Sequence, residues 1–434
     1  MQSQAHGTPL RAFLTLWLGQ LISGLGSSLS GFALGVWIFQ TTGSTTQFAI
    51  TTLTFVLPFA LLAPVAGTLV DRWDRRWTMI GADTGQALVT LLLAVLLFTD
   101  RLAVWHIYLA TTASAIFGAF HGPAYGASIP LLVPKDYLVR MGGLGRLTQG
   151  VNRLLAPVLA GLLVTIIGLK GVVLIDLATF LFALLTYALV RIPRPPVTPE
   201  SAQAAGNFWR ELHFVWRYLW ARPGLLGLVL IGGLQNLFGG IAGTLLMPLT
   251  LSITTVDRVG VILGIVASGT LMSGVVLSTW GGPKRLMVGA CGLLALSGVG
   301  FLLAGWAPLL IAVTAGHFMA MFGGATAGSL MGALEQRKVA LTVQGRVFGV
   351  EGMIALLFEA TAYPTAGLLA DQIFEPAMRE GGVAAPYLGP LIGSGPGRGM
   401  GLLTLLMGSA LVVTALVSYM ITRIRRVEDE LPDV

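Results

Sequence analysis

Gly67-Thr-Leu-Val-Asp71-Arg72-Trp-Asp74-Arg75-Arg76 is the stretch that decides the fold of this chain of 434 residues. Five charged side chains fall within six positions of it, and the sequence on either side, at 47–70 and 77–98, is a long apolar run. Charges this dense between two apolar runs indicate a short loop at a membrane surface.

The composition of the chain requires a lipid environment. Mean hydropathy is +0.82 and only 10% of the residues are charged, whereas a soluble domain carries about 25%. A helix needs about 20 apolar residues to cross a bilayer, and continuous runs favour helices over a closed barrel, whose strands would alternate. We expect about twelve spans, at 12–39, 47–70, 77–98, 104–130, 142–168, 172–192, 225–251, 259–280, 286–305, 307–333, 347–370 and 400–422.

The basic residues are distributed unequally over the two sides of these spans. The net charge is +7, and Lys and Arg together number 26. If the first span starts in the cytoplasm, 19 of the 26 fall in inner loops and ends and five in outer loops. The positive-inside rule then places both termini in the cytoplasm. The charge therefore needs no nucleic-acid partner to explain it.

A polar segment separates the spans into two sets of six. Residues 193–206 are rich in proline and predict an extended linker. Residues 207–222 place Trp and Leu at helical spacing between arginines, which predicts an amphipathic helix at the membrane interface. We expect an N-terminal bundle at 1–192, a linker with this helix at 193–224 and a C-terminal bundle at 225–434. The helix either tethers the two halves or has a regulatory role.

The two halves of the chain resemble copies of each other. When the first half is shifted by 207 residues, Gly67 falls on Gly274 and Pro157 falls on Pro364. A parallel repeat of six spans is typical of transporters built from two related halves. We therefore predict an all-α transmembrane fold of twelve helices in two pseudo-symmetric six-helix bundles.

The charged loop resembles a known family signature. Its pattern, Gly-x3-Asp-Arg-x-x-Arg-Arg, is similar to the loop 2–3 signature of the major facilitator superfamily of secondary transporters. Further segments resemble the macrolide-efflux and enterobactin-exporter branch of that family, namely 71–76, 129–135, 174–180 and 336–348. The resemblance implies a bacterial inner-membrane exporter of twelve spans that works by alternating access and is coupled to protons.

The resemblance also implies a conformational latch in the charged loop. Gly67 lacks a Cβ and would let two helices approach, while Asp71 could accept hydrogen bonds from a helix N-terminus. Arg72, Arg75 and Arg76 could reach a carboxylate of a neighbouring span. The latch would be made when the transporter faces outward and broken when it faces inward. The alternative is a plain anchor that sets topology, for which the arginines alone would suffice.

A stretch in the expected span 142–168 is similar to the antiporter signature of drug–proton exporters. Gly143, Pro157 and Gly161 match this signature strictly, but Asn152 stands where the signature has a glycine. Small residues with a proline would produce a bent, closely packed helix. General helix packing is therefore the alternative, and the departures leave the direction of transport open.

Four carboxylates at membrane depth are candidates for carrying a proton. Each charge there costs about 2.5–3.5 kcal/mol on insertion scales, so each should face a cavity or a partner. Glu359 is the first choice, with a structural ion pair as the alternative. Asp176 is the second, although it could simply cap its span. Asp83 and Glu351 lie near the expected cytoplasmic face and could instead belong to the latch.

Other polar side chains are candidates for lining a substrate cavity. Arg153 is expected to be the most buried positive charge, where it could recognise an anionic group or pair with a carboxylate. His121 and His317 could contact substrate or protons, or could be packing residues. The remaining candidates are Gln20, Gln149, Asn152 and Asn236.

The chain is therefore predicted to be a proton-coupled exporter of a medium-sized amphipathic compound, such as a macrolide-like drug, and not an enzyme. The alternatives are an exporter of a siderophore or other endogenous metabolite, a lipid or lysolipid transporter, and a receptor or scaffold. The sequence has no Gly-x4-Gly-Lys-Ser/Thr phosphate loop, and its single cysteine, Cys291, excludes a Cys-based metal site. We expect no cofactor or metal. The expected partners are the small-molecule substrate, protons and the bilayer, with the chain acting as a monomer.

Overall fold

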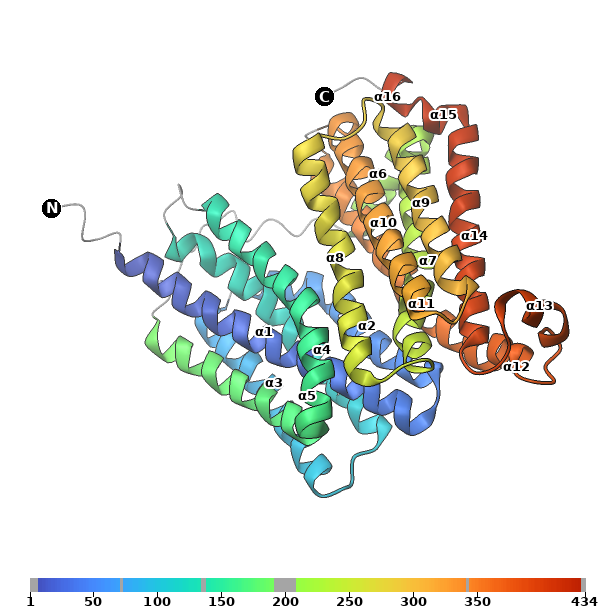
Figure 1. Cartoon of the computed structure of the whole chain (residues 1–434). Helices are drawn as coiled ribbons and strands as arrows, with labels where there is room; N and C mark the ends of the chain where they lie inside the picture. Colours follow the sequence, from blue (N-terminus) through green and yellow to red (C-terminus); the bar gives the residue numbers. More distant parts are fainter. Residues whose placement is uncertain (1–6, 71–72, 134–137, 191–207, 341–342, 431–434) are drawn as a thin grey trace. The chain divides into compact units, whose positions relative to one another are not determined.

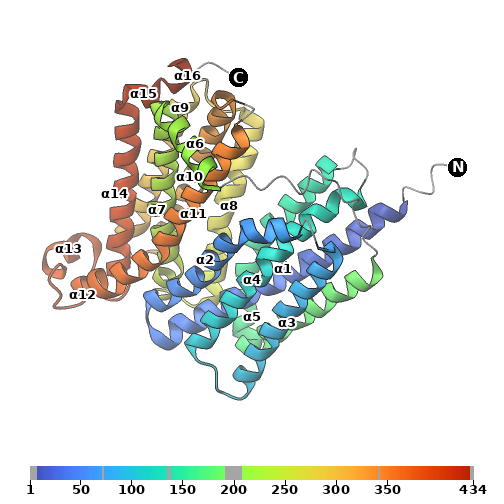
Figure 2. The same ribbon diagram turned by 180° about the vertical axis from the view of Figure 1, so that it is seen from behind.

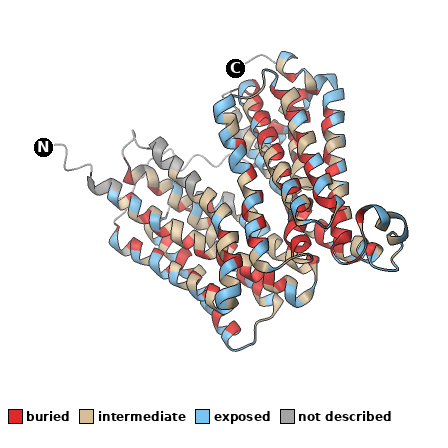
Figure 3. Ribbon diagram, viewed as in Figure 1, coloured by how far each residue is buried: buried red, intermediate tan, exposed pale blue. Residues whose placement is uncertain are grey.

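The computed structural model describes residues 7–70, 73–133, 138–190, 208–340 and 343–430. Every regular element among these residues is a helix (Figure 1). Ten of the helices are long and apolar enough to cross a membrane. Many large apolar side chains are exposed, which is the pattern expected where the solvent is lipid. Figure 3 marks the exposed positions along the helices of each unit.

The chain divides into two compact units. Unit 1 comprises Met1–Gly43, Ile50–Ala204 and Val256–Gly264, and the remaining residues form unit 2. The first residues of α2 therefore belong to unit 2, and the first residues of α8 belong to unit 1. The predicted domain boundaries at 192 and 224 stay a prediction.

Five long helices build unit 1. They are α1 (Gly7–Thr42), α2 (Thr45–Val70), α3 (Arg75–Phe98), α4 (Val104–Leu132) and α5 (Leu138–Leu189). In α5, Gly168 has a φ of 68° and interrupts the helical backbone, a conformation that glycine adopts without steric cost. The expected spans 142–168 and 172–192 are thus the two arms of α5, joined directly at this glycine.

Unit 2 contains the remaining helices. They are α6 (Phe208–Trp220), α7 (Pro223–Leu251), α8 (Val256–Trp280), α9 (Leu286–Trp306), α10 (Leu310–Lys338), α11 (Gln344–Leu369), η3 (Ala370–Phe374), α12 (Glu375–Met378), α13 (Ala385–Ile392), α14 (Arg398–Met420), α15 (Thr422–Arg425) and α16 (Val427–Glu430). Within this unit α9 packs between α10 and α14, and α7 packs against α11 and α14 (Figures 1 and 2). With α4 and the divided α5, the long helices account for the predicted twelve.

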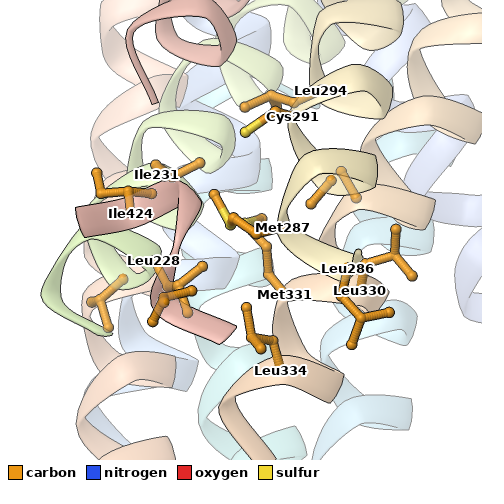
Figure 4. Packing of buried hydrophobic residues seen from close by; sticks show 14 of the residues in the cluster. Leu228, Ile231, Leu286, Met287, Cys291, Leu294, Leu330, Met331, Leu334 and Ile424 are labelled. Atoms are coloured by element: carbon orange, nitrogen blue, oxygen red, sulfur yellow. The ribbon is translucent and has the colours of Figure 1, made fainter. Parts of the chain in front are cut away.

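The interior of unit 2 is a continuous apolar core. Leu294 and Cys291 of α9 pack with Met331 of α10 and Ile231 of α7 (Figure 4). The helices approach closely where α9 and α10 both carry glycine, because a Cβ on Gly300 would lie 2.5 Å from the carbonyl oxygen of Gly316. Small residues at such contacts are the usual means of helix association in lipid.

Charged side chains cap several helix ends of unit 2. Asp371, in the π-helical turn η3, accepts hydrogen bonds from the Ser44 hydroxyl at 2.7 Å and from the backbone N–H groups of Thr45 and Thr46 at 3.0 and 2.8 Å. Glu375 accepts from the backbone N–H of Met400 at 2.8 Å. These carboxylates satisfy the free N–H groups at the starts of α2 and α14 and interact favourably with the helix dipoles.

The helix α6 lies within the segment predicted to form an amphipathic helix. Val215 and Leu219 are buried in the core of unit 2, whereas Trp216 and Trp220 are exposed. A belt of exposed tryptophan is typical of a helix at a membrane interface.

Candidate functional site

Four polar side chains meet inside unit 1 around a buried carboxylate, and we call them the Asp83 quartet. Asp83 is only 2% exposed. Its Oδ2 accepts hydrogen bonds from the Tyr187 hydroxyl at 2.9 Å and from Gln20 Nε2 at 3.1 Å. His121 Nε2 lies 3.4 Å from Asp83 Oδ1 and 3.0 Å from the Tyr187 oxygen. The quartet is thus a closed network that contains three ionisable side chains, those of Asp83, His121 and Tyr187.

Each member of the Asp83 quartet comes from a different helix. Gln20 lies on α1, Asp83 on α3, His121 on α4 and Tyr187 on α5. A close approach of α3 and α4 brings two of them together, because a Cβ at Gly85 would lie 2.5 Å from the Phe117 ring. A change of protonation at Asp83 would therefore act on the packing of four helices at once.

A second polar level lies two helical turns further along the same helices. Ser27 follows Gln20 by seven residues on α1, and Thr90 follows Asp83 by seven on α3, a spacing that returns to the same helix face about 10 Å away. Both hydroxyl groups donate to Asp176 of α5, at 3.1 and 3.4 Å. Asp176 is 3% exposed.

A cavity of about 420 Å³ opens beside Asp176. All five long helices of unit 1 contribute to its wall, which we call the Asp176 cavity. Hydroxyl groups, among them those of Ser28 and Thr111, share the wall with apolar side chains such as Phe55 and Phe180. A concave, mostly apolar site with a few convergent polar groups is the usual form of a small-molecule site.

An apolar groove runs between α3 and α4. Its volume is about 760 Å³, and Trp77, Phe117 and Phe120 line it. Trp73 stacks on Phe120 with ring centroids 5.7 Å apart. Trp73 and Trp77 are at least half exposed, so the groove is accessible from the surroundings of unit 1.

The described part of the charged loop caps helices. Asp74 accepts hydrogen bonds from the backbone N–H groups of Arg76 and Trp77 and so begins α3. Arg75 and Arg76 were expected to reach a carboxylate, but they donate to the carbonyl oxygens of Ala127 and Tyr187, at 2.6 and 2.7 Å. The Tyr187 carbonyl lies in the last turn of α5, where a cation is favoured by the unpaired C=O groups, whereas the Ala127 carbonyl lies five residues before the end of α4. Asp71, Arg72 and the surroundings of Gly67 lie outside the described residues.

The expected acids of unit 2 occupy two different surroundings. Glu359 is half-buried, and its Oε1 accepts from the Tyr363 hydroxyl one turn along α11 at 2.7 Å. Glu351 lies within hydrogen-bonding reach of Glu335, a buried residue of α10 that sequence reasoning missed. Because one carboxyl group must carry the proton in such a contact, the Glu335–Glu351 pair is a further proton-binding candidate.

Two polar candidates of unit 2 form local hydrogen bonds. His317 is fully buried, with Nδ1 2.9 Å from the Val313 carbonyl oxygen and its ring edge-on to Phe301. Asn236 donates to the Gly232 carbonyl oxygen at 2.9 Å, also within its own helix. These contacts favour the packing role for His317.

The substrate-cavity candidates on the first arm of α5 differ in burial and contacts. Asn152 lies against Gly24 of α1, and its buried Oδ1 has no hydrogen-bond partner among the described residues. Arg153 is exposed, so the expectation that it is the most buried cation is wrong. Arg398 is buried instead, where it donates to the carbonyl oxygen of Gly305 at the end of α9. The side chain of Gln149 lies outside the described residues.

Sequence reasoning missed two members of these sites. Tyr187 completes the Asp83 quartet and Thr90 supports Asp176. A helical spacing could have found both, since Tyr187 follows Asp176 by 11 residues and Thr90 follows Asp83 by seven, so each pair shares a helix face.

Comparison with known proteins identifies relatives across most of the chain. The family model described as "Major Facilitator Superfamily" matches residues 16–362. Macrolide efflux protein A of Streptococcus pyogenes is 30% identical over 381 residues, which cover 83% of this chain and 90% of that protein. The enterobactin exporter EntS of Salmonella typhi is 29% identical over 228 residues, which cover 52% of this chain and 53% of EntS.

Solved structures show the same fold at low sequence identity. A bacterial homologue of the human lysosomal transporter Spinster has a TM-score of 0.75 at 15% identity, and the likeness covers 98% of each chain. A bacterial homologue of the iron transporter ferroportin has a TM-score of 0.65 at 15% identity. The family model covers well over half of the chain and the helical architecture agrees with it. The chain therefore belongs to the Major Facilitator Superfamily of membrane transporters and is not an enzyme.

Proposed function

We propose that the chain is a secondary active exporter that moves a medium-sized amphipathic compound, such as a macrolide-like drug, out of a bacterial cell in exchange for protons. It would lie in the inner membrane as a monomer with both termini in the cytoplasm, and would work by alternating access. The relatives named as a macrolide efflux protein and an enterobactin exporter support export. The excess of basic residues in the expected inner loops supports the orientation.

The Asp83 quartet is the observation that carries proton coupling. An isolated carboxylate is costly at membrane depth and is rarely placed there without a role. Asp83 combines near-complete burial with a His and a Tyr partner, an arrangement through which a proton can be taken up and passed on. Neither Glu359 nor Asp176 has a titratable partner of this kind on a second helix among the described residues.

Protonation of Asp83 would change its hydrogen bonding. The carboxylate accepts from Tyr187 and Gln20, whereas the neutral acid would have to donate one hydrogen bond and would lose its attraction for a protonated His121. Because four helices meet at the quartet, this change would shift the balance between packing arrangements of unit 1. A shift of that kind is how a bound proton favours one access state over the other.

The charged loop keeps its proposed role as a conformational latch. Gly67, Asp71, Arg72, Arg75 and Arg76 would form it. Support comes from the loop's second function of capping helix ends, since Arg75 and Arg76 tie the start of α3 to α4 and α5. A rearrangement of these capping bonds would couple the loop to the helices that hold the quartet.

One observation favours a second candidate function. The groove between α3 and α4 is lined by aromatic side chains and is accessible from outside unit 1, and aromatic belts are characteristic of the bilayer interface. A lipid or lysolipid could lie in such a groove. Export of a siderophore or other metabolite remains the alternative within the exporter class, supported by the likeness to EntS.

The test uses inverted membrane vesicles with an imposed proton gradient. Accumulation of a radiolabelled macrolide is measured beside that of a catecholate siderophore and a lysophospholipid, with and without the gradient. The variants are Asp83→Asn, Glu359→Gln and the matched control Asp100→Asn. Asp100 is an exposed residue of unit 1 with a φ of 55°, a conformation that Asn tolerates.

We expect gradient-driven accumulation of the macrolide in the wild type and in Asp100→Asn. Asp83→Asn should lower it by about tenfold or more, which corresponds to ~1.4 kcal/mol. The same variant should retain gradient-independent exchange of labelled for unlabelled substrate, which shows that it is folded and binds. Gradient-driven accumulation that persists in Asp83→Asn but is lost in Glu359→Gln would move the proton site to α11. Accumulation of the lysophospholipid alone would replace the exporter with the lipid transporter.

A further inference from the structure

We infer that the Asp176 cavity is a binding site for an organic ammonium ion, with Asp176 as its counter-ion. This inference rests on the proposed function, since it names the chemical class to which the exported amphipathic compound belongs. It follows from the volume of the cavity, from the unused hydrogen-bonding capacity of the Asp176 carboxylate and from the apolar and aromatic side chains that line the walls.

The cavity has the size of a ligand site. Its volume of about 420 Å³ falls in the range of roughly 300–1,000 Å³ that small-molecule pockets occupy. It would hold the charged part of an amphipathic molecule and leave the rest outside. Because every long helix of unit 1 contributes to the wall, a bound ligand would contact the whole unit.

Asp176 has more hydrogen-bonding capacity than the described residues use. A carboxylate offers about four lone-pair sites, and the hydroxyl groups of Ser27 and Thr90 occupy two of them, with Ser30 also close by. No Lys, Arg or His within the described ranges lies within ion-pair distance of Asp176. A buried carboxylate without a cation is costly, so the missing positive charge is one that a ligand can supply.

The walls select an organic cation over a metal ion. Calcium takes six to eight oxygen ligands and magnesium six, whereas Asp176 is the only acidic residue in the cavity wall as described. Phe55, Phe180 and Leu34 supply apolar surface, and aromatic faces attract weakly hydrated ammonium groups. An alkylated ammonium group would satisfy both the carboxylate and these walls.

The experiment compares a charged ligand with its neutral isostere. The probes are a para-substituted phenyltrimethylammonium ion and the corresponding tert-butylbenzene, which differ by the replacement of N⁺ with carbon. Dissociation constants are measured on the purified full-length chain in nanodiscs, with no proton gradient. The wild type should bind the ammonium at least about tenfold more tightly than the isostere.

Substitution then assigns the discrimination to one residue. Asp176→Asn should remove the tenfold preference for the ammonium ion and leave the affinity for the neutral isostere within about twofold of the wild-type value. The control, Asp100→Asn, removes the same charge from an exposed site of unit 1 and should keep the preference. Equal loss of both ligands in a monodisperse Asp176→Asn would overturn the inference, because the residue would then only maintain the cavity. A wild type that does not discriminate would also overturn it, without reliance on any variant.

The two proposals fail separately. If the ammonium preference depends on Asp176 but no gradient drives transport, the proposed proton coupling fails and the cation site stands. If Asp176→Asn abolishes gradient-driven transport without any change in ammonium affinity, Asp176 is a proton site and the cation site fails.

Discussion

Two carboxylates of unit 1 differ from two half-buried carboxylates of unit 2 in what they contact. In unit 1, Asp83 and Asp176 accept hydrogen bonds from side chains, namely a tyrosine, a glutamine, a serine and a threonine. In unit 2, Asp371 and Glu375 accept chiefly from backbone N–H groups at helix starts. The same residue type thus serves two purposes, and the kind of donor distinguishes them.

The kind of donor matters because a backbone N–H group can only donate a hydrogen bond and cannot accept one. A carboxylate that caps a helix is held in its charged form by donors that are always present, so it contributes stability and little else. Hydroxyl and imidazole groups can reverse their hydrogen bonds when the acid takes up a proton. We therefore expect changes to Asp83 and Asp176 to affect coupling or ligand binding, and changes to the helix-capping Asp371 and Glu375 to affect stability.

The largest effect that would test this comparison comes from Tyr187→Phe. The change removes the hydroxyl that donates to Asp83 at 2.9 Å and contacts His121. We expect gradient-driven accumulation to fall by about three- to tenfold, since part of the network would remain, with a stability loss of only about 1 kcal/mol. Initial rates in inverted vesicles measure it, and Tyr387→Phe, at a residue that is 80% exposed, is the control. Unchanged coupling would show that the quartet is structural.

A smaller effect, on stability and not on coupling, is expected from Asp371→Asn. The amide has one acceptor oxygen in place of two, so its NH₂ group would face one of the donors of Thr45, Thr46 or Ser44. The loss should be about 1–2 kcal/mol of unfolding free energy, with the ratio of protons to substrate unchanged. Thermal unfolding of the purified chain and the coupling ratio are measured together. Intact stability with lost coupling would reverse the roles assigned to the two units.

The smallest effect is expected where an acid has a side-chain partner but no burial. Lys170 Nζ lies 3.1 Å from Asp100 Oδ1, and both side chains are largely exposed to the surroundings. Lys170→Ala should cost less than about 0.5 kcal/mol, and added salt should weaken even that. Unfolding free energies at low and high ionic strength provide the measurement. A loss above about 1 kcal/mol would mean that a side-chain partner alone stabilises an acid here.

Much of the architecture could be predicted from the sequence because lipid imposes a simple rule. Long apolar runs must become helices that satisfy their own backbone, and the runs at 77–98 and 286–305 correspond closely to α3 and α9. The expected spans also end at 168 and start again at 172, on either side of Lys170, which agrees with the break in α5 at Gly168. What the sequence does not show is that one glycine of positive φ joins the two arms directly.

The candidate site could be predicted only in part. The sequence singles out Asp83 as a proton-carrier candidate, and Gln20 and His121 as candidates for lining a cavity, but their meeting point depends on the rotation of α1, α3 and α4 about their axes. Tyr187 is easily overlooked because tyrosine is common near the ends of spans, and only its spacing of 11 residues from Asp176, which places both on one helix face, points to it. Arg75 and Arg76 are expected from the sequence to reach a carboxylate, whereas they donate to backbone carbonyl groups of α4 and α5, acceptors that sequence patterns do not reveal.

The burial of Cys291 has a practical consequence for measuring motion. The thiol is the only one in the chain and is packed in the core of unit 2 beside Leu294 and Met331 (Figure 4). Thiol-directed spin labels and fluorophores would therefore react first with cysteines introduced at exposed positions, such as Leu88 of unit 1 and Leu416 of unit 2. Pairs of labels could report distances between the units during a transport cycle without prior removal of the native cysteine.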